Sequence, residues 1–195
     1  MVDEAFAEHT TDALDLDGAA LPGLVRVRSL TKVWGVAGLR VGYVLAEPAL
    51  VERLAAVLQP WPVNVAALAV VEHLFGEGAD AMEAERRRRV AAVDAARTAL
   101  LDGLAPPPLQ VQAGPANFAL LRHEHLDLRT ALLGRGVAVR RCDTFPGLDR
   151  SWVRVAVHPD PAVGRRLVAA LADVLRGRPD RARPVAASAR ARPAG

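Results

Sequence analysis

The sequence predicts an α/β protein in which a first part of short strands and helices is followed by a small α+β domain. In residues 1–78, some segments have apolar residues at every second position, as in strands. Others have them at a spacing of about 3.6 residues, as in helices. An amphipathic pattern from Ala79 to Leu104 then predicts one long linking helix. After the proline cluster 106–108 the order becomes β-β-α-β-β-α up to residue 177, which is typical of a two-layer α+β domain.

Turn and helix signals define the elements of the first part. MVDEAF is expected to be the end of a strand followed by a loop, and the glycines of TKVWGVAGLR predict a turn-rich connection rather than a regular helix. Asn64 is expected to cap a mostly buried helix after the break at Pro60-Trp61-Pro62. The other elements expected here are strands at 24–30 and 41–46, and helices at 48–59 and 64–76.

The second part shows the same kinds of signal. We expect the run Arg86–Arg89 to be a solvated face of the long helix, and the Arg/Pro/Ala-rich residues 178–195 to be a disordered basic tail. Strands are expected at LQVQAG, ANFALLRH, VAVRRC and SWVRVAV, and helices at HLDLRTALLGRG and PAVGRRLVAALADVLRG.

Charge and composition exclude several classes of protein. The formal net charge is +3, but residues 178–195 alone carry five arginines and one aspartate, so the basicity is not in a folded nucleic-acid-binding patch. No apolar run reaches the roughly 18–20 residues that cross a bilayer. The acidic N-terminus does not resemble a signal peptide, which predicts a cytoplasmic protein. Cys142 is the only cysteine, and His123 and His125 have no third ligand in register, so no metal site is expected.

Lysine is almost absent from this chain. Of the 25 basic side chains, 24 are arginine and only Lys32 is lysine. An arginine cannot be deprotonated and cannot form an imine, whereas a lysine can do both. Lys32 is therefore a candidate for an amine whose chemistry arginine cannot replace.

The residues around Lys32 suit a phosphorylated aldehyde. Ser29 offers a hydroxyl donor and Arg40 a bidentate guanidinium, both of which bind phosphate. If the aldehyde is pyridoxal phosphate, its pyridine nitrogen also needs a carboxylate partner, and Asp3 can supply it. These four side chains predict a cofactor site.

Several motifs resemble, in order, the C-terminal half of a class I/II aminotransferase, a fold-type I pyridoxal-phosphate enzyme. Within this class the chain is most similar to histidinol-phosphate aminotransferases and to the threonine-phosphate decarboxylases of cobalamin biosynthesis. The stretch DTFPGLD and the Trp-Pro pair favour the cobalamin group. The motifs are VDEAF, SLTKVWGVAGLRVGY, QPWPVN, PANFALLR and RGVAVRRCDTFPGLDRSWVRVAV.

The resemblance implies a role for each cofactor-site residue. Lys32 would be the Schiff-base lysine and the proton shuttle. Asp3 would pair with the pyridinium nitrogen, and Ser29 and Arg40 would hold the cofactor phosphate. Many relatives have a tyrosine three positions after the aspartate, but this chain has Phe6, which cannot donate that hydrogen bond.

The resemblance also implies two substrate contacts and a domain organisation. Arg154 would bind the substrate α-carboxylate, and Arg140 would be a second anion contact suited to a phosphorylated substrate. Residues 1–78 would be the C-terminal part of the large cofactor domain, and 79–177 the small domain. Because the family has more of the large domain before VDEAF, we expect a C-terminal fragment with an uncovered apolar sheet face. A homodimer is expected for the full-length family.

The sequence supports more than one function. The first is a pyridoxal-phosphate aminotransferase acting on a small-molecule amino acid or amino-acid phosphate. The first alternative is a decarboxylase of the threonine-phosphate type, because the reaction depends on how the substrate is oriented. The second alternative is a non-catalytic remnant that folds without a cofactor site. A nucleic-acid-binding module is the weakest hypothesis, since only the tail is basic.

Overall fold

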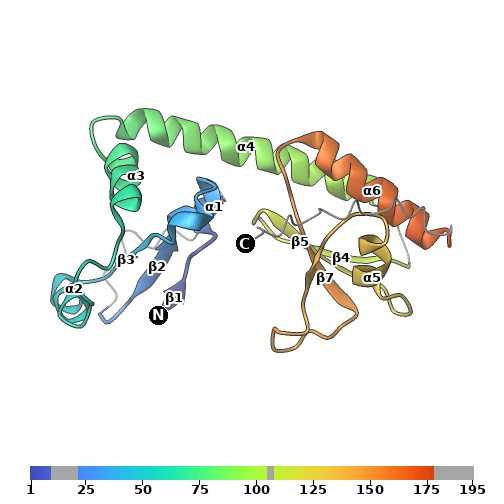
Figure 1. Ribbon diagram of the computed structural model, residues 1–195, viewed down its shortest axis with the longest axis horizontal. Coiled ribbons are helices and arrows are strands. Elements are labelled where there is room, and N and C mark those ends of the chain that lie inside the picture. The colour runs from blue at the N-terminus through green and yellow to red at the C-terminus, as the bar shows by residue number, and fades with distance from the viewer. Residues whose placement is uncertain (10–21, 105–107, 178–195) are drawn as a thin grey trace, which may run out of the picture.

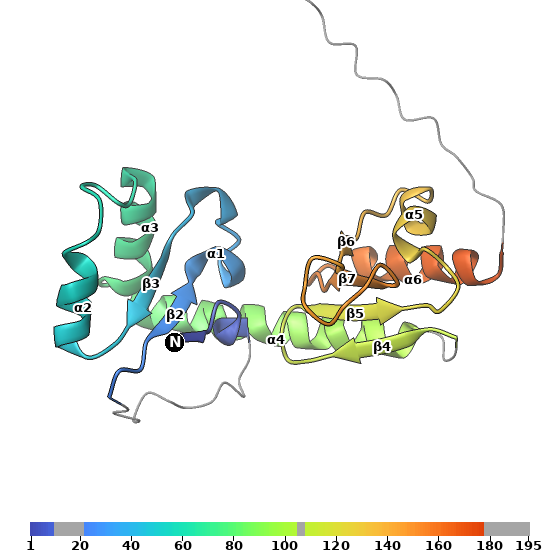
Figure 2. The ribbon, with the colours of Figure 1, turned by 90° about the horizontal axis from the view of Figure 1, so that it is seen from below.

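The computed structural model describes residues 1–9, 22–104 and 108–177, which form two lobes joined by one long helix (Figure 1). The first lobe has a three-stranded sheet in the order β1-β2-β3, and the second has a four-stranded sheet in the order β4-β5-β7-β6. Helix α4 (Ala79–Gly103) runs beside both lobes, as Figure 2 shows. The expected tail at 178–195 lies outside the described residues.

The first sheet combines one parallel and one antiparallel pair. In the parallel pair Asp3 lies opposite Val27, and in the antiparallel pair Ser29 lies opposite Gly42. Strands β1 and β2 therefore end at the same edge of the sheet. The strands of this sheet are β1 (Val2–Asp3), β2 (Arg26–Ser29) and β3 (Gly42–Leu45).

The glycine-rich connection after β2 differs from the expectation in one respect. It begins with a helical turn, α1 (Leu30–Val33), before the 3-10 helix η2 (Ala37–Leu39). The expectation of no helix was wrong because Ser29 caps this turn, with its hydroxyl accepting a hydrogen bond from the Thr31 amide at 3.3 Å. The chain then returns, and the Leu30 amide donates to the Val41 carbonyl at 3.3 Å.

Helices α2 (Pro48–Ala55) and α3 (Val65–Phe75) complete the first lobe. Asn64 caps α3 as expected, since its side chain accepts a hydrogen bond from the Ala67 amide at 2.9 Å. The expected burial of α3 was wrong: only Ala67 and Leu74 are buried. The helix packs one face on the small cluster around Leu30 and leaves the other face exposed.

The second lobe is a sheet covered on one face by helices. Alternate residues Leu121, Val153 and Val155 belong to a core shared with α4, α5 (Leu128–Leu133) and α6 (Pro161–Leu175). Figure 1 shows α4 and α6 side by side above the strands. The strands are β4 (Gln110–Ala113), β5 (Phe118–Arg122), β6 (Arg140–Arg141) and β7 (Trp152–Ala156).

No helix of the described residues packs on the opposite face of this sheet. Because side chains alternate along a strand, Phe118 and Leu120 of β5 and Arg154 of β7 lie on this open face. Their positions are half-buried, whereas those of the intervening residues are buried. The open face is therefore available to a ligand or to the first lobe.

Arginines of α4 fasten the first lobe to the long helix. The Arg86 guanidinium donates to the Glu8 carbonyl at 3.0 Å, and the Arg89 guanidinium donates to the Val33 carbonyl at 3.4 Å. Arg89 also lies over the Trp34 ring, 5.2 Å from its centroid. The expectation that Arg86–Arg89 is only a solvated face was wrong for these two residues. Within the described ranges, no helix combines the length and apolar character needed to cross a membrane.

Candidate functional site

Asp3 and Ser29 are placed at one edge of the first sheet. They end the neighbouring parallel strands β1 and β2, and ligands of α/β proteins bind beyond the carboxyl ends of such strands. Asp3 is exposed, and its carboxylate accepts a hydrogen bond from the Ala5 amide at 2.9 Å. The carboxylate is thus oriented by its own turn and open to a ligand.

Arg40 is brought to the same place by the returning chain. It lies two residues before Gly42, which faces Ser29 across the strand pair. Its backbone is left-handed, with φ 52° and ψ 48°, which costs a non-glycine residue on the order of 1–2 kcal/mol. Ser29 and Arg40 therefore flank the base of one loop, and a hydroxyl and a guanidinium there suit an anion such as phosphate.

Lys32 is on the helical turn that follows Ser29. Its side chain is exposed, and its Nζ lies 5.2 Å from the centroid of the Phe6 ring. This cation–π contact orients the amine without a carboxylate partner among the described residues. An amine held in this way is accessible to an aldehyde.

An ion-pair cluster of Glu4 with Arg26 and Arg28 supports this edge of the sheet. The Glu4 carboxylate accepts hydrogen bonds from Arg26 at 2.8 Å and from Arg28 at 2.9 Å. Burial acts to raise the pKa of Glu4, but the hydrogen bonds and charges of the two arginines outweigh it and lower the pKa below its ordinary value. Glu4 therefore stays ionised and ties β1 to β2 directly behind Asp3.

Two further titratable groups, His9 and Glu8, have shifted pKa values in the first lobe. His9 is 4% exposed and stacks obliquely on Phe6, and its pKa is lowered by burial and then by the Lys32 charge. Burial raises the pKa of Glu8, although the Tyr43 hydroxyl donates to this carboxylate at 3.0 Å. The motif VDEAF carries the signal for Glu4, but nothing local in the sequence indicates the burial of His9.

The two expected substrate arginines face each other in the second lobe. Arg140 of β6 lies directly opposite Arg154 of β7. Each guanidinium lies over an aromatic ring, Arg154 at 5.0 Å from the Phe118 centroid and Arg140 at 5.6 Å from the Phe145 centroid. Like charges opposite each other repel, so an anion between them relieves the repulsion.

An aromatic contact joins the two groups of residues. The rings of Phe6 and Phe118 are 5.3 Å apart at an angle of 74°, an edge-to-face arrangement. Lys32 lies over the first ring and Arg154 over the second. The structure thus places one expected cofactor residue, Lys32, and one expected substrate arginine, Arg154, on the two rings of one aromatic pair. Phe118 was not singled out from the sequence, because a phenylalanine in an alternating strand is typical of packing.

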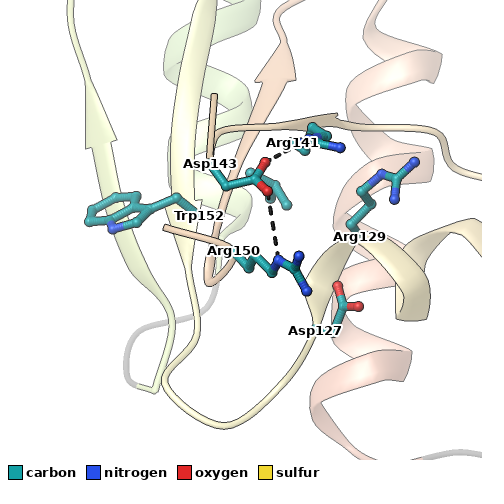
Figure 3. A pocket seen from close by; sticks show the side chains of 7 residues that line it. Asp127, Arg129, Arg141, Asp143, Arg150 and Trp152 are labelled. Atoms are coloured by element: carbon teal, nitrogen blue, oxygen red, sulfur yellow. Dashed lines mark hydrogen bonds and ion pairs between the residues drawn. The ribbon is translucent and has the colours of Figure 1, made fainter. Parts of the chain in front are cut away.

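A separate pocket lies on the second lobe (Figure 3). Its volume is about 260 Å³, and Asp143 crosses one side of it to contact Arg141 at 2.6 Å and Arg150 at 3.7 Å. None of the expected site residues lines this pocket. Its lining residues are Asp127, Arg129, Arg141, Asp143, Arg150, Trp152 and Val153.

Comparisons with known proteins identify the family of this chain. The family described as aminotransferase class I and II matches residues 1–171. A histidinol-phosphate aminotransferase of Mycobacterium tuberculosis is 38% identical over 175 residues, covering 89% of this chain and 46% of the relative. A threonine-phosphate decarboxylase of Salmonella typhimurium is 35% identical over 184 residues, covering 91% of this chain and 49% of the relative.

The fold also resembles solved structures. The crystal structure of histidinol-phosphate aminotransferase from Clostridium acetobutylicum superposes with a TM-score of 0.77 at 26% identity, covering 90% of this chain and 54% of that one. The chain spans about half the length of the curated relatives that it matches. The expected family resemblance is confirmed, and this chain belongs to the aminotransferase class I and II family.

Proposed function

We propose that this chain carries the lysine-bearing part of a pyridoxal-phosphate aminotransferase that acts on an amino acid or an amino-acid phosphate. Residues 1–78 would belong to the large cofactor domain and 79–177 to the small domain. The proposal rests on one observation: the only lysine lies beside Ser29 and Arg40, at the edge where β1 ends in Asp3. Family membership supports it.

The described residues fit the cofactor. Lys32 offers an exposed amine, Asp3 an exposed carboxylate, and Arg40 a guanidinium with no carboxylate partner among the described residues. A structure of a family relative from Sinorhizobium meliloti is described in complex with pyridoxal 5'-phosphate. Pyridoxal phosphate supplies an electron-withdrawing ring that stabilises negative charge on a substrate α-carbon.

Each residue of the proposed site has a distinct task in this proposal. Asp3 keeps its ring-nitrogen partner protonated by ion pairing. Lys32, as an unprotonated amine, would take a proton from the substrate α-carbon and deliver it to the former aldehyde carbon of the cofactor. Arg154 holds the substrate carboxylate through a bidentate fork, and Arg140 binds a second anionic group. Two arginines, Arg154 and Arg140, are thus assigned to the substrate, which favours an anionic substrate.

The alternative is a decarboxylase, and the Salmonella typhimurium relative favours it. In that reaction the bond to the carboxylate breaks rather than the bond to the α-hydrogen. Turnover that requires an oxo acid acceptor indicates transamination. Release of carbon dioxide without an acceptor indicates decarboxylation.

The test uses the single lysine. The chain is incubated with pyridoxal phosphate at low concentration and reduced with borohydride, and its peptides are then mapped by mass. We expect one adduct per chain, on Lys32, and none at that position in Lys32→Arg. In Arg40→Gln we expect weaker labelling by pyridoxal phosphate but unchanged labelling by pyridoxal, which lacks the phosphate. Equal labelling of the N-terminal amine and Lys32 would refute the proposal and favour a non-catalytic remnant.

A further inference from the structure

The aromatic pair Phe6–Phe118 connects two lobes that have separate sheets and are joined by α4. Phe6 follows β1 of the first lobe, and Phe118 begins β5 of the second. Both rings are half-buried, and neither belongs to the main hydrophobic cluster of its lobe. Because the two rings lie outside both hydrophobic clusters, we assign them a role in positioning the side chains that contact them rather than in core packing.

Each ring carries one cationic group of the proposed site. The Lys32 amine lies 5.2 Å from the Phe6 centroid, and the Arg154 guanidinium lies 5.0 Å from the Phe118 centroid. The rings themselves are 5.3 Å apart and edge-to-face. Cation–π and edge-to-face contacts are directional, so together they fix where one cation stands relative to the other.

We propose that Phe6 and Phe118 are positioning residues that hold Arg154 at a defined place relative to the Lys32 amine. This inference rests on the proposed function, in which the Lys32 amine acts on the substrate α-carbon and Arg154 holds the carboxylate bonded to that carbon. Phe6 acts through Lys32 and Phe118 through Arg154, and neither ring takes part in bond making. A phenylalanine at position 6 therefore has a positive role here that does not depend on a hydroxyl.

The chain allows a test that needs no cofactor. Lys32 is reductively alkylated with 4-carboxybenzaldehyde or with neutral benzaldehyde in the presence of cyanoborohydride. The amine adds to the aldehyde carbon, water leaves, and hydride from the reagent reduces the carbon–nitrogen double bond. Each rate is divided by that of the N-terminal amine in the same sample. The ratio of the two normalised rates is the carboxylate preference of Lys32.

In the wild-type chain we expect a carboxylate preference of about tenfold, the effect of one charge-assisted hydrogen bond. Arg154→Gln should abolish it. Phe118→Leu should lower it by at least about twofold, the lower end of what an edge-to-face pair contributes. In Phe118→Leu the normalised rate of Lys32 alkylation by neutral benzaldehyde should stay unchanged. Phe118→Tyr, which keeps the ring, should retain the carboxylate preference.

Phe75→Leu is the matched control. It removes a similar edge-to-face pair, Tyr43–Phe75, whose rings are 5.9 Å apart and contact neither Lys32 nor Arg154. We expect this variant to keep the wild-type preference. The inference is overturned if the wild-type chain shows no preference, if Phe118→Leu keeps it, or if Phe75→Leu lowers it equally.

The two proposals fail in different ways. A chain that shows the carboxylate preference but takes no pyridoxal phosphate on Lys32 contradicts the proposed function and supports the positioning role. A chain that takes pyridoxal phosphate specifically on Lys32 but shows no carboxylate preference supports the proposed function and contradicts the positioning role.

Discussion

Glu4 follows Asp3 in the sequence and anchors the end of β1 to β2. Its buried carboxylate contacts two arginines, and their charges keep its pKa below the ordinary value. A group with a lowered pKa in the folded state contributes stability above its unfolded pKa and loses that contribution as the pH falls through its folded pKa. The free energy of unfolding should therefore depend on Glu4 at neutral pH and much less in acid.

We predict that Glu4→Gln lowers the free energy of unfolding by about 1.5–3 kcal/mol at pH 7, because it removes the charge from two hydrogen bonds. The difference from the wild-type chain should shrink as the pH is lowered from about 5 to 3. Urea unfolding at each pH measures it. Glu47→Gln is the control, since Glu47 is exposed and makes no side-chain cap hydrogen bond. An equal loss in both variants, or a difference that grows in acid, would contradict the prediction.

The loop between β2 and β3 shows how an element brings Ser29 and Arg40 together. A Cβ atom at Gly42 would lie 2.4 Å from the Arg28 carbonyl oxygen of the neighbouring strand. Only glycine fits this approach without moving the backbone. The closed base of the loop is thus a property of the strand pair rather than of the loop residues.

We predict that Gly42→Ala lowers the free energy of unfolding of the first lobe by about 1–3 kcal/mol, as expected for an overpacked site. It should also weaken labelling of Lys32 by pyridoxal phosphate, because the base of the loop opens. Gly38→Ala is the control in the same loop, since a Cβ there meets nothing within 4 Å. If the two alanine variants behave alike in urea unfolding and in labelling, the close approach at Gly42 is not what holds the loop.

At the scale of the whole molecule, the two lobes differ in how much apolar surface they bury. The cluster of the second lobe has 14 buried residues, and that of the first has four. Most of the exposed large hydrophobic side chains belong to residues 1–75, including Val44 of β3 and Leu68 of α3. Among the described residues, exposed apolar side chains are therefore concentrated in the first lobe, on helices as well as strands, and the expected uncovered sheet face stays a prediction.

We predict that backbone amides of β2 and β3 exchange with solvent about tenfold or more faster than those of β5 and β7, since fewer buried contacts must open. Hydrogen exchange followed by mass spectrometry measures this difference. Leu121→Ala, which removes a fully buried side chain and costs about 2–5 kcal/mol, should speed exchange in the second lobe only. Equal protection of the two sheets would show that the lobes open as one unit.

The sequence by itself determined the family, the order of nearly all helices and strands, and the kinds of side chain at the site. These depend on local signals: the alternation in FALLR, the cap at Asn64, and the single lysine in SLTKVWG. The missed turn at Leu30 and the overestimated burial of α3 are failures of the same local reading. The boundary at residue 78 and the roles of all the site residues stay predictions: Asp3, Ser29, Lys32, Arg40, Arg140 and Arg154.

Only the tertiary structure decided which distant residues meet. Phe6 and Phe118 lie far apart in the sequence and touch because α4 carries both lobes and the second sheet leaves one face open. Arg89 turns from an expected surface residue into a contact with Trp34 for the same reason. Propensity and periodicity report on neighbours within a few residues. A contact between the two lobes depends instead on their relative positions along the long helix α4.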